Sequence, residues 1–193
     1  MKNLYPLLAA WCCTLALSPA LAQGLGNFVD AAHFPIDYGA DNMAVGGAFH
    51  QRLAQTLTVE VGGTLEGVFL PIGCGSNAGN GKITVEIHDV AGGQPGPTVL
   101  ASRKVAPGEF DSPNARFTFV PIPGALALAA GQQIAVVIER AKGEDCACHQ
   151  SPVGSDYPGG QGFFEALPNP PGWVPFSTFP GTPDDIPFQL VLS

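Results

Sequence analysis

The chain has 193 residues and a formal net charge of −8, and only 12% of its residues are charged. An acidic chain with only eight Lys and Arg residues binds nucleic acids and anionic membranes poorly, so we expect neither class of partner. Apolar residues make up 46% of the chain, beside 25 glycines and 19 prolines, which indicates a globular protein with many short strands and tight turns rather than a disordered one.

The first 22 residues have the features of a secretory signal peptide. Lys2 is the only charge before Asp30, Leu4–Leu17 is an apolar run, and the segment 18–22 (SPALA) carries the small residues of a cleavage site. We therefore predict a signal peptide over 1–22, cleavage after Ala22, and export to the periplasm or the outside of the cell. Removing 22 of the 193 residues leaves 171, which is enough for one domain with a core.

Two alternatives for the N-terminus are weaker. A membrane anchor needs an apolar run of roughly 20 residues, and this run is shorter. A lipid-modified cysteine needs a small residue before it, whereas Cys12 follows Trp11. We therefore expect no membrane insertion after cleavage.

The next segments are read from their apolar spacing. Residues 23–50 are rich in glycine and have few regularly spaced apolar residues, which predicts a loose lead-in with one short strand. A single domain is expected over 51–193. Apolar and polar residues alternate in 51–61 and 83–88, which predicts half-buried strands, and 65–71 is apolar on both faces, which predicts a central strand.

The segment after the second of these strands is predicted to be a loop. Residues 89–97 contain three glycines and two prolines, a composition that breaks helices and strand ladders. Further strands are predicted at 98–101, 115–120, 132–140, 145–151, 162–166, 173–176 and 186–192. In the strongest of them, 132–140, the residues Ile134, Val136 and Ile138 are expected to face the core. Leu126, Leu128 and Ala130 alternate, and we interpret 124–130 as extended.

About nine short strands without an amphipathic helix predict an all-β fold. The architecture that buries such strands is a two-sheet antiparallel sandwich of the jelly-roll type, following the N-terminal signal segment. The segment 51–193 also resembles a family of exported bacterial jelly-roll domains, related in shape to the galactose-binding-like sandwiches. The residues that carry this resemblance are Asp89, Gly93, Pro95, Gly96, Leu100, Ala101, Leu128, Gly131, Ile134 and the run 157–161 (YPGGQ).

The resemblance implies a fold more than an activity, because these residues occupy turns and the core. Related sandwiches include sugar-binding members, so the resemblance makes sugar binding an expectation. This chain departs from the family in two ways. It has 167–172 (LPNPPG) where relatives carry a Ser/Asp/Gly turn before the tryptophan, and cysteines where relatives tend to have aromatic residues.

The cysteines predict a disulfide. The predicted mature chain holds Cys74, Cys146 and Cys148, an odd number in an oxidising compartment. A direct bond between the two cysteines of a Cys-x-Cys strand is strained, so we expect Cys74 to pair with Cys146 or Cys148, in a mixture of both linkages. The remaining thiol is expected to allow slow, pH-dependent dimer formation by a mostly monomeric protein. The alternative is a zinc or copper(I) site that uses these sulfurs and His149.

A cation site is a weaker prediction. Asp184 and Asp185, together with Asp156 or Asp145, are candidates for binding calcium. No Asp-x-Asp-x-Asp-Gly loop is present, and aspartate also favours the starts of turns. We expect no cofactor other than this possible calcium ion.

Motifs for catalysis are absent from the sequence. Neither Gly-x-Ser-x-Gly nor Ser-x-x-Lys occurs, and the four histidines form no metal-binding pattern. Three glutamates on predicted strands, Glu86, Glu139 and Glu165, could supply the carboxylate pair of a polysaccharide hydrolase. A glutamate on the polar face of a strand is also simply an expected surface residue, so we predict no catalytic residue.

Aromatic residues are the remaining candidates for binding. Six of them lie within 23 residues near the C-terminus, among many prolines: Tyr157, Phe163, Phe164, Trp173, Phe176 and Phe179. Rings exposed on a rim would stack on sugars or pack on a partner. We expect ligand contacts from Tyr157, Phe164, Trp173 and Phe176, in a non-catalytic module that binds glycan. The alternative is a structural or protein-interaction component of the cell envelope with no small ligand.

Overall fold

The computed structural model describes most of the chain from Gly26 onward. It covers residues 26–34, 36, 42–74, 81–110, 115–140, 145–148, 156–167, 171–178 and 185–193. The predicted signal peptide, His149 and Asp184 lie outside these described residues.

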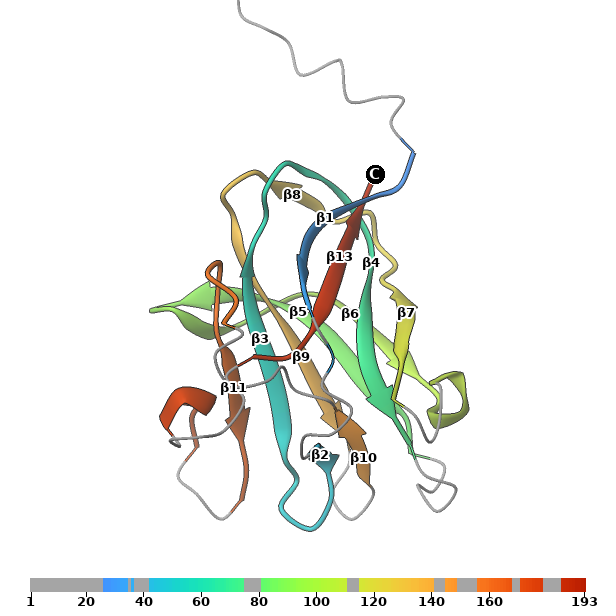
Figure 1. Ribbon diagram of the computed structural model, residues 1–193, viewed down its shortest axis with the longest axis vertical. Helices are drawn as coiled ribbons and strands as arrows, with labels where there is room; N and C mark the ends of the chain where they lie inside the picture. The colour runs from blue at the N-terminus through green and yellow to red at the C-terminus, as the bar shows by residue number, and fades with distance from the viewer. Residues whose placement is uncertain are drawn as a thin grey trace, which may run out of the picture.

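Two antiparallel sheets pack face to face in a sandwich (Figure 1). The seven-stranded sheet has the order β1-β13-β4-β10-β2, with β7 and β8 also paired to β4. Its strands are β1 (Phe28–His33), β2 (Met43–Gly46), β4 (Gly62–Gly73), β7 (Phe117–Pro121), β8 (Ala127–Ala129), β10 (Asp145–Cys148) and β13 (Phe188–Leu192). The six-stranded sheet has the order β12-β11-β3-β9-β5-β6. Its strands are β3 (Arg52–Thr58), β5 (Ile83–Ala91), β6 (Gln94–Val105), β9 (Gln133–Arg140), β11 (Gly162–Glu165) and β12 (Val174–Pro175).

The predicted two-sheet antiparallel sandwich is confirmed. Within the described residues the only helical turns are two short 3-10 segments, η1 (Pro107–Glu109) and η2 (Phe176–Thr178). Most connections carry the chain from one sheet to the other, and only β1–β2, β5–β6, β7–β8 and β11–β12 stay within a sheet. This repeated crossing is the winding of a jelly roll. No helix in the described part of the chain is long and apolar enough to cross a membrane.

The core lies between the sheets and is built from alternate residues of each strand. Ile134, Val136 and Ile138 of β9 are at most 1% exposed, as their spacing predicted. β4 is the central strand of its sheet, also as predicted, because it pairs with β13 and β10 along one edge and with β7 and β8 along the other.

The lead-in over 23–50 is more ordered than its sequence predicted. It contributes both β1 and β2 to the seven-stranded sheet, where β1 pairs with β13 and β2 pairs with β10. Neither strand shows a long apolar alternation, and β1 contains a bulge between Val29 and Ala31. Strands this short are stabilised by partners more than 100 residues away in the sequence, so their local pattern gives a weak signal.

The segment 89–97 was predicted to be a loop, but most of it belongs to two paired strands that form a hairpin. β5 runs on to Ala91, β6 resumes at Gln94, and the turn between them is formed by Gly92 and Gly93 with φ of 62° and 82°. Positive φ at both central residues is the requirement of a type I′ turn, which glycine meets without strain. β6 is an edge strand, so the missing N–H groups of Pro95 and Pro97 are tolerated there.

Candidate ligand-binding surface

Three charged side chains meet on the outer face of the six-stranded sheet. Arg52 of β3 lies opposite Glu165 of β11 in the strand register, and Glu139 of β9 flanks Arg52 on the other side. Their neighbours Leu53 and Ile138 face the core and are at most 1% exposed, so the alternation of the strands turns the three charges outward.

Arg52 joins the two glutamates in a network. Its Nε donates to Glu165 Oε2 over 2.9 Å, and its Nη2 contacts the same oxygen. Its Nη1 lies 3.5 Å from Glu139 Oε2, while His50 Nε2 lies 3.3 Å from Glu139 Oε1. The Gly172 N–H donates to Glu165 Oε1 over 2.8 Å, so both oxygens of this carboxylate are held.

The network keeps Glu165 ionised. Burial by itself would raise the pKa of Glu165, but hydrogen bonds from Arg52 and the Gly172 N–H, together with the positive charge of Arg52, hold this pKa below its ordinary value. A glycosidase needs a carboxylic acid whose pKa is raised so that it carries a proton to the leaving group. The shift of Glu165 has the opposite direction, so this glutamate lacks the property of a general acid.

Trp173 borders the network. It stands one residue before β12, and the Arg52 guanidinium carbon lies 4.9 Å from the centroid of its ring. The ring also packs on a small apolar cluster on the outer face of the sheet, formed by Ala54, Val137 and Phe163. Trp173 is only partly buried, so it presents both an apolar surface and a cation–π contact beside three charged groups.

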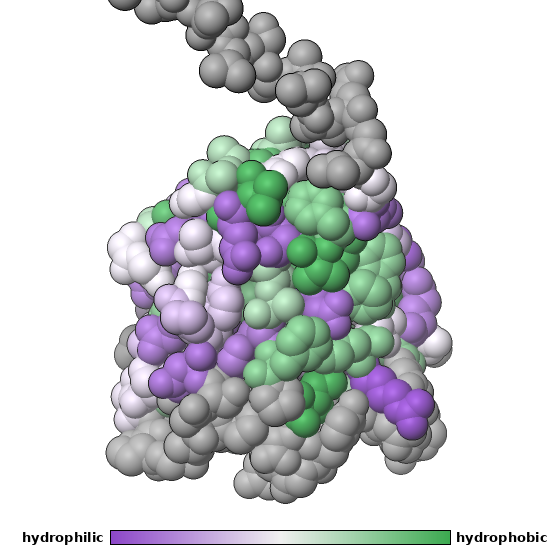
Figure 2. All heavy atoms as spheres, turned by 45° about the horizontal axis from the view of Figure 1, so that its top comes forward, coloured by the Kyte–Doolittle hydropathy of each residue, from purple (hydrophilic) through white to green (hydrophobic). Residues whose placement is uncertain are grey.

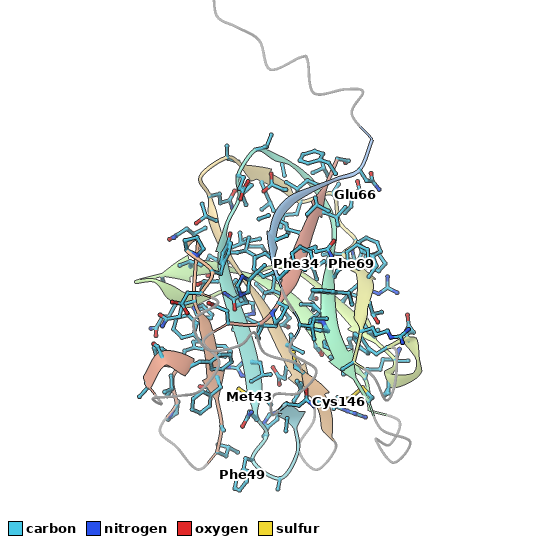
Figure 3. All side chains as sticks on the ribbon, viewed as in Figure 1. Phe34, Met43, Phe49, Glu66, Phe69 and Cys146 are labelled. Carbon is cyan, nitrogen blue, oxygen red and sulfur yellow. A yellow bond between two sulfur atoms is a disulfide. The ribbon has the colours of Figure 1, made fainter. Side chains whose placement is uncertain are left out.

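A hollow of about 250 Å³ lies over these residues. We call it the Arg52 hollow; its lining includes His50, Arg52, Glu139, Glu165, Leu167 and Pro171. Two apolar residues lie at its edge. The Leu167 N–H donates to Phe49 O over 2.8 Å, which brings the two residues together, and the side chains are 48% and 61% exposed, respectively. Figure 3 shows Phe49 at the tip of the turn between β2 and β3.

None of the four aromatic candidates is among the residues that line this hollow, and only Trp173 packs beside it, on Arg52. Tyr157 is 7% exposed and Phe176 is 2% exposed, so both belong to the core. Phe164 pairs with Leu53 and therefore points inward, where its ring stacks on Phe176 at 6.2 Å. The expectation that these three contact a ligand is not supported by their positions. Their clustering in the sequence reflects packing, and only Trp173 lies on an accessible face.

The strand register selects one disulfide. Ala147 pairs with Gly73 and Cys148 with Ile72, so Cys146 stands opposite Cys74, with a Cα–Cα distance of 4.3 Å, and the two are bonded. Cys148 lies diagonally from Cys74, and diagonal neighbours are about 7–8 Å apart, beyond the usual range for a disulfide. The predicted bond to Cys74 is confirmed, but the expected mixture of linkages is replaced by a single one.

Cys148 is sealed in the core as a thiol. Its side chain is 0% exposed, and burial raises its pKa to about 12. The expected thiol-linked dimer is therefore disfavoured, because Cys148 neither reaches the surface nor ionises readily. The alternative metal site also loses support, since two of its sulfurs are consumed in the disulfide and the described residues hold no cluster of three metal-binding side chains.

The aspartates proposed for calcium do not form a site within the described residues. Asp156 is exposed, whereas Asp185 is 2% exposed and accepts hydrogen bonds from Gln55 Nε2 over 2.8 Å and from the Tyr157 N–H over 2.9 Å. Gln55 Oε1 in turn accepts from the Ile186 N–H. Asp185 therefore joins β3 to the segments that flank β11 and β13, which is a structural role.

Asp185 is expected to make stability depend on pH. Burial raises its pKa above the ordinary 3.8, against the opposing hydrogen bonds from Tyr157 and Gln55. Its favourable contribution is therefore complete below about pH 3.8 and is lost as the pH rises through the folded-state pKa. We expect the free energy of unfolding of wild type to fall relative to that of Asp185→Asn as the pH is raised from 3 to 7. Urea titration of both proteins at each pH measures this difference. A constant difference from pH 3 to pH 7 would contradict the raised pKa.

Glu86 lies outside the Arg52 network. Its Oε2 is 2.8 Å from His88 Nε2, and His88 Nδ1 is 2.9 Å from Gly96 O. His88 is only 7% exposed, and the register between β5 and β6 shifts at this residue. The contacts of Glu86 and His88 join residues within the β5–β6 hairpin. Of the three glutamates considered for a carboxylate pair, only Glu139 and Glu165 therefore contact the same residue, Arg52.

A second exposed apolar surface covers the outer face of the seven-stranded sheet. Figure 2 shows apolar side chains gathered over β1, β13, β4 and β7, and Figure 3 labels Phe34 and Phe69 there. Phe34 contacts Phe117 at 5.5 Å between centroids, and Phe69 contacts Phe119 at 5.0 Å. In β7, Val120 faces the core and the two phenylalanines face out. Sequence reasoning missed this because both faces of β7 carry apolar residues.

The chain was compared with known proteins. Neither the models of known protein families nor the curated proteins give a match.

Proposed function

We propose that the protein is an exported, non-catalytic β-sandwich module that binds glycan in the Arg52 hollow. The observation that carries the proposal is that the Trp173 ring packs on Arg52 beside an accessible hollow lined by Arg52, Glu139 and Glu165. Sugars present apolar C–H faces and closely spaced hydroxyl groups. An aromatic ring suits the former, and fixed planar polar groups suit the latter.

The fixed geometry of the network favours binding over catalysis. Arg52 holds both carboxylates, and Glu165 has its pKa lowered rather than raised. Preformed polar groups lose little side-chain entropy when a ligand arrives, which favours affinity. Glu165, with its lowered pKa, is not suited to donate the proton that hydrolysis of a glycosidic bond requires.

Export is part of the proposal. The apolar N-terminal segment with its cleavage site supports it, and the disulfide between Cys74 and Cys146 is compatible with it, because such bonds persist in oxidising compartments. A periplasmic or extracellular module meets the polysaccharides of the cell envelope and its surroundings.

A glycan array tests the function. Trp173→Ala should weaken saturable binding of a responding glycan by about tenfold or more, since an aromatic contact contributes about 1.5 kcal/mol beyond burial. The matched control is Phe119→Ala, which removes an aromatic ring that is 38% exposed on the opposite sheet and should leave binding unchanged. A wild-type array without response, or equal loss in both variants, would refute the proposal. Release of reducing ends from a bound glycan would favour the hydrolase alternative.

An envelope-protein partner is the second candidate. The observation in its favour is the aromatic surface over β1, β4 and β7, where Phe34 is 52% exposed and Phe119 is 38% exposed. A photo-crosslinker at Phe119 in living cells should then give one discrete adduct, while the same group at Val99, which is 47% exposed on the other sheet, should give none. A discrete adduct at Phe119, together with a glycan array on which the protein binds no glycan, would support a protein-interaction role over glycan binding.

A further inference from the structure

The Arg52 network is part of a longer polar row. Thr84 of β5 pairs with Lys104 of β6 on one side and with Glu139 of β9 on the other. From Glu139 the register continues through Arg52 to Glu165, and the next position is Trp173. The row thus crosses five strands in one line, at Lys104, Thr84, Glu139, Arg52 and Glu165, and it ends at Trp173, one residue before β12. With strands about 4.8 Å apart, it spans roughly 24 Å.

Two hollows lie along this cross-strand row and share Glu139. The Arg52 hollow occupies one half. The other half holds a hollow of about 370 Å³, which we call the Lys104 hollow, lined by Lys82, Thr84, Lys104, Glu139 and Arg140. Because Glu139 borders both, a ligand in one hollow can extend into the other along the row.

The neighbouring register row limits where a ligand can lie. On β9, β3 and β11 it runs through Val137, Ala54 and Phe163, which are at most 3% exposed and packed with Trp173. Only on β5 and β6 does this row carry polar residues, Glu86 and Ser102. On β9, β3 and β11 the neighbouring row therefore offers no polar side chain to a ligand, whereas the cross-strand row presents Glu139, Arg52 and Glu165 there. The geometry therefore favours a ligand that runs across the strands rather than along them.

The two ends of the row differ in charge. Lys82 and Lys104 are exposed, and among the described residues neither forms an ion pair. At the other end the charge of Arg52 is shared between two carboxylates. Two lysines beside one hollow are notable in a chain with eight Lys and Arg residues against 16 Asp and Glu residues. This end suits an anionic group.

We propose that the cross-strand row binds a linear acidic oligosaccharide, with carboxylate or sulfate groups at Lys82 and Lys104 and a sugar ring against Trp173. The inference rests on the proposed function and specifies its ligand. A chain of several sugar units has the extended shape that a row of this length requires, and simultaneous contact at both ends makes affinity depend on chain length.

The test compares oligomers of different length and charge. Isothermal titration would use galacturonate and alginate oligomers of two, four and six units, and cello-oligosaccharides of the same lengths as neutral probes. We expect the acidic hexamers to bind about tenfold or more tighter than the dimers, and more tightly than the neutral hexamers. Lys104→Ala and Lys82→Ala should each weaken acidic hexamer binding about tenfold, with a reduced dependence on salt.

Arg103→Ala is the matched control for charge. Arg103 pairs with the inward-facing Val85, and its guanidinium donates to Pro121 O and to Glu109, away from the row. It should leave acidic hexamer binding unchanged, although it removes the same charge one residue from Lys104. Equal losses in Arg103→Ala and Lys104→Ala would mean that only net charge matters and would overturn the proposal.

The remaining outcomes separate this inference from the proposed function. Suppose that Trp173→Ala weakens the binding of a glycan on the array, but neither greater length nor acidity of the oligomer improves binding. The proposal for the cross-strand row then fails, and the proposal that the Arg52 hollow binds glycan survives. If acidic hexamers bind without dependence on Trp173, the ligand does not span the row and the proposal is overturned. If neither the array nor the oligomers show binding, both proposals fail.

Discussion

Replacing Cys146 by serine is expected to lower the free energy of unfolding by about 4 kcal/mol. The disulfide joins residues 72 positions apart, so its loss releases a long loop in the unfolded chain. Cys148 should not substitute for Cys146, because the register places it diagonally from Cys74. Urea unfolding under non-reducing conditions measures the effect, and thiol titration of the unfolded variant without residues 1–22 should find two thiols, Cys74 and Cys148.

Cys148→Ala is the control for this experiment. It removes a buried sulfur but leaves the disulfide intact, so we expect a loss of only about 1 kcal/mol from the small cavity. Wild-type protein that lacks residues 1–22 should show one titratable thiol when unfolded without reductant. A Cys74–Cys148 peptide on mapping, or equal destabilisation of the two variants, would contradict the assignment.

Asp30→Ala is expected to destabilise the protein by about 3 kcal/mol. The Asp30 carboxylate is nearly buried and accepts three backbone N–H groups from the turn between β3 and β4. Its Oδ2 accepts from Glu60 over 2.7 Å, and its Oδ1 accepts from Val61 over 2.8 Å and from Gly62 over 3.0 Å. Alanine would leave these donors without an acceptor and would detach the turn from β1. Thermal or urea unfolding measures the loss.

A second aspartate provides a comparison. Asp89 accepts one backbone N–H, from Thr98 over 2.9 Å, at an exposed part of the β5–β6 hairpin. Asp89→Ala should therefore cost about 1 kcal/mol. Asp30→Asn should fall between wild type and Asp30→Ala, because the amide presents only one acceptor atom to three donors. If Asp30→Ala proves no more harmful than Asp89→Ala, the three bonds do not stabilise the turn.

The strands of this protein were largely determined by local sequence. Alternation in 132–140 predicted both the strand Gln133–Arg140 and its inward residues, because a period of two is a property of the backbone. Alternation in 51–61 predicted the strand Arg52–Thr58 in the same way. The glycines and prolines marked the turns for the same local reason. The hairpin at Gly92–Gly93 was misread because a proline forbids pairing only on the side where its N–H would be needed, and β6 is an edge strand.

The candidate site depended on tertiary structure. That Arg52, Glu139 and Glu165 each face outward could be inferred from their buried neighbours, but their meeting required the register between strands up to 113 residues apart. The same holds for the choice of Cys146 over Cys148, and for the burial of Tyr157 and Phe176 while Trp173 stays accessible. A sequence determines which face of its own strand a residue occupies. Only the pairing of distant strands decides which residues become neighbours, because register is set by the packing of the whole core.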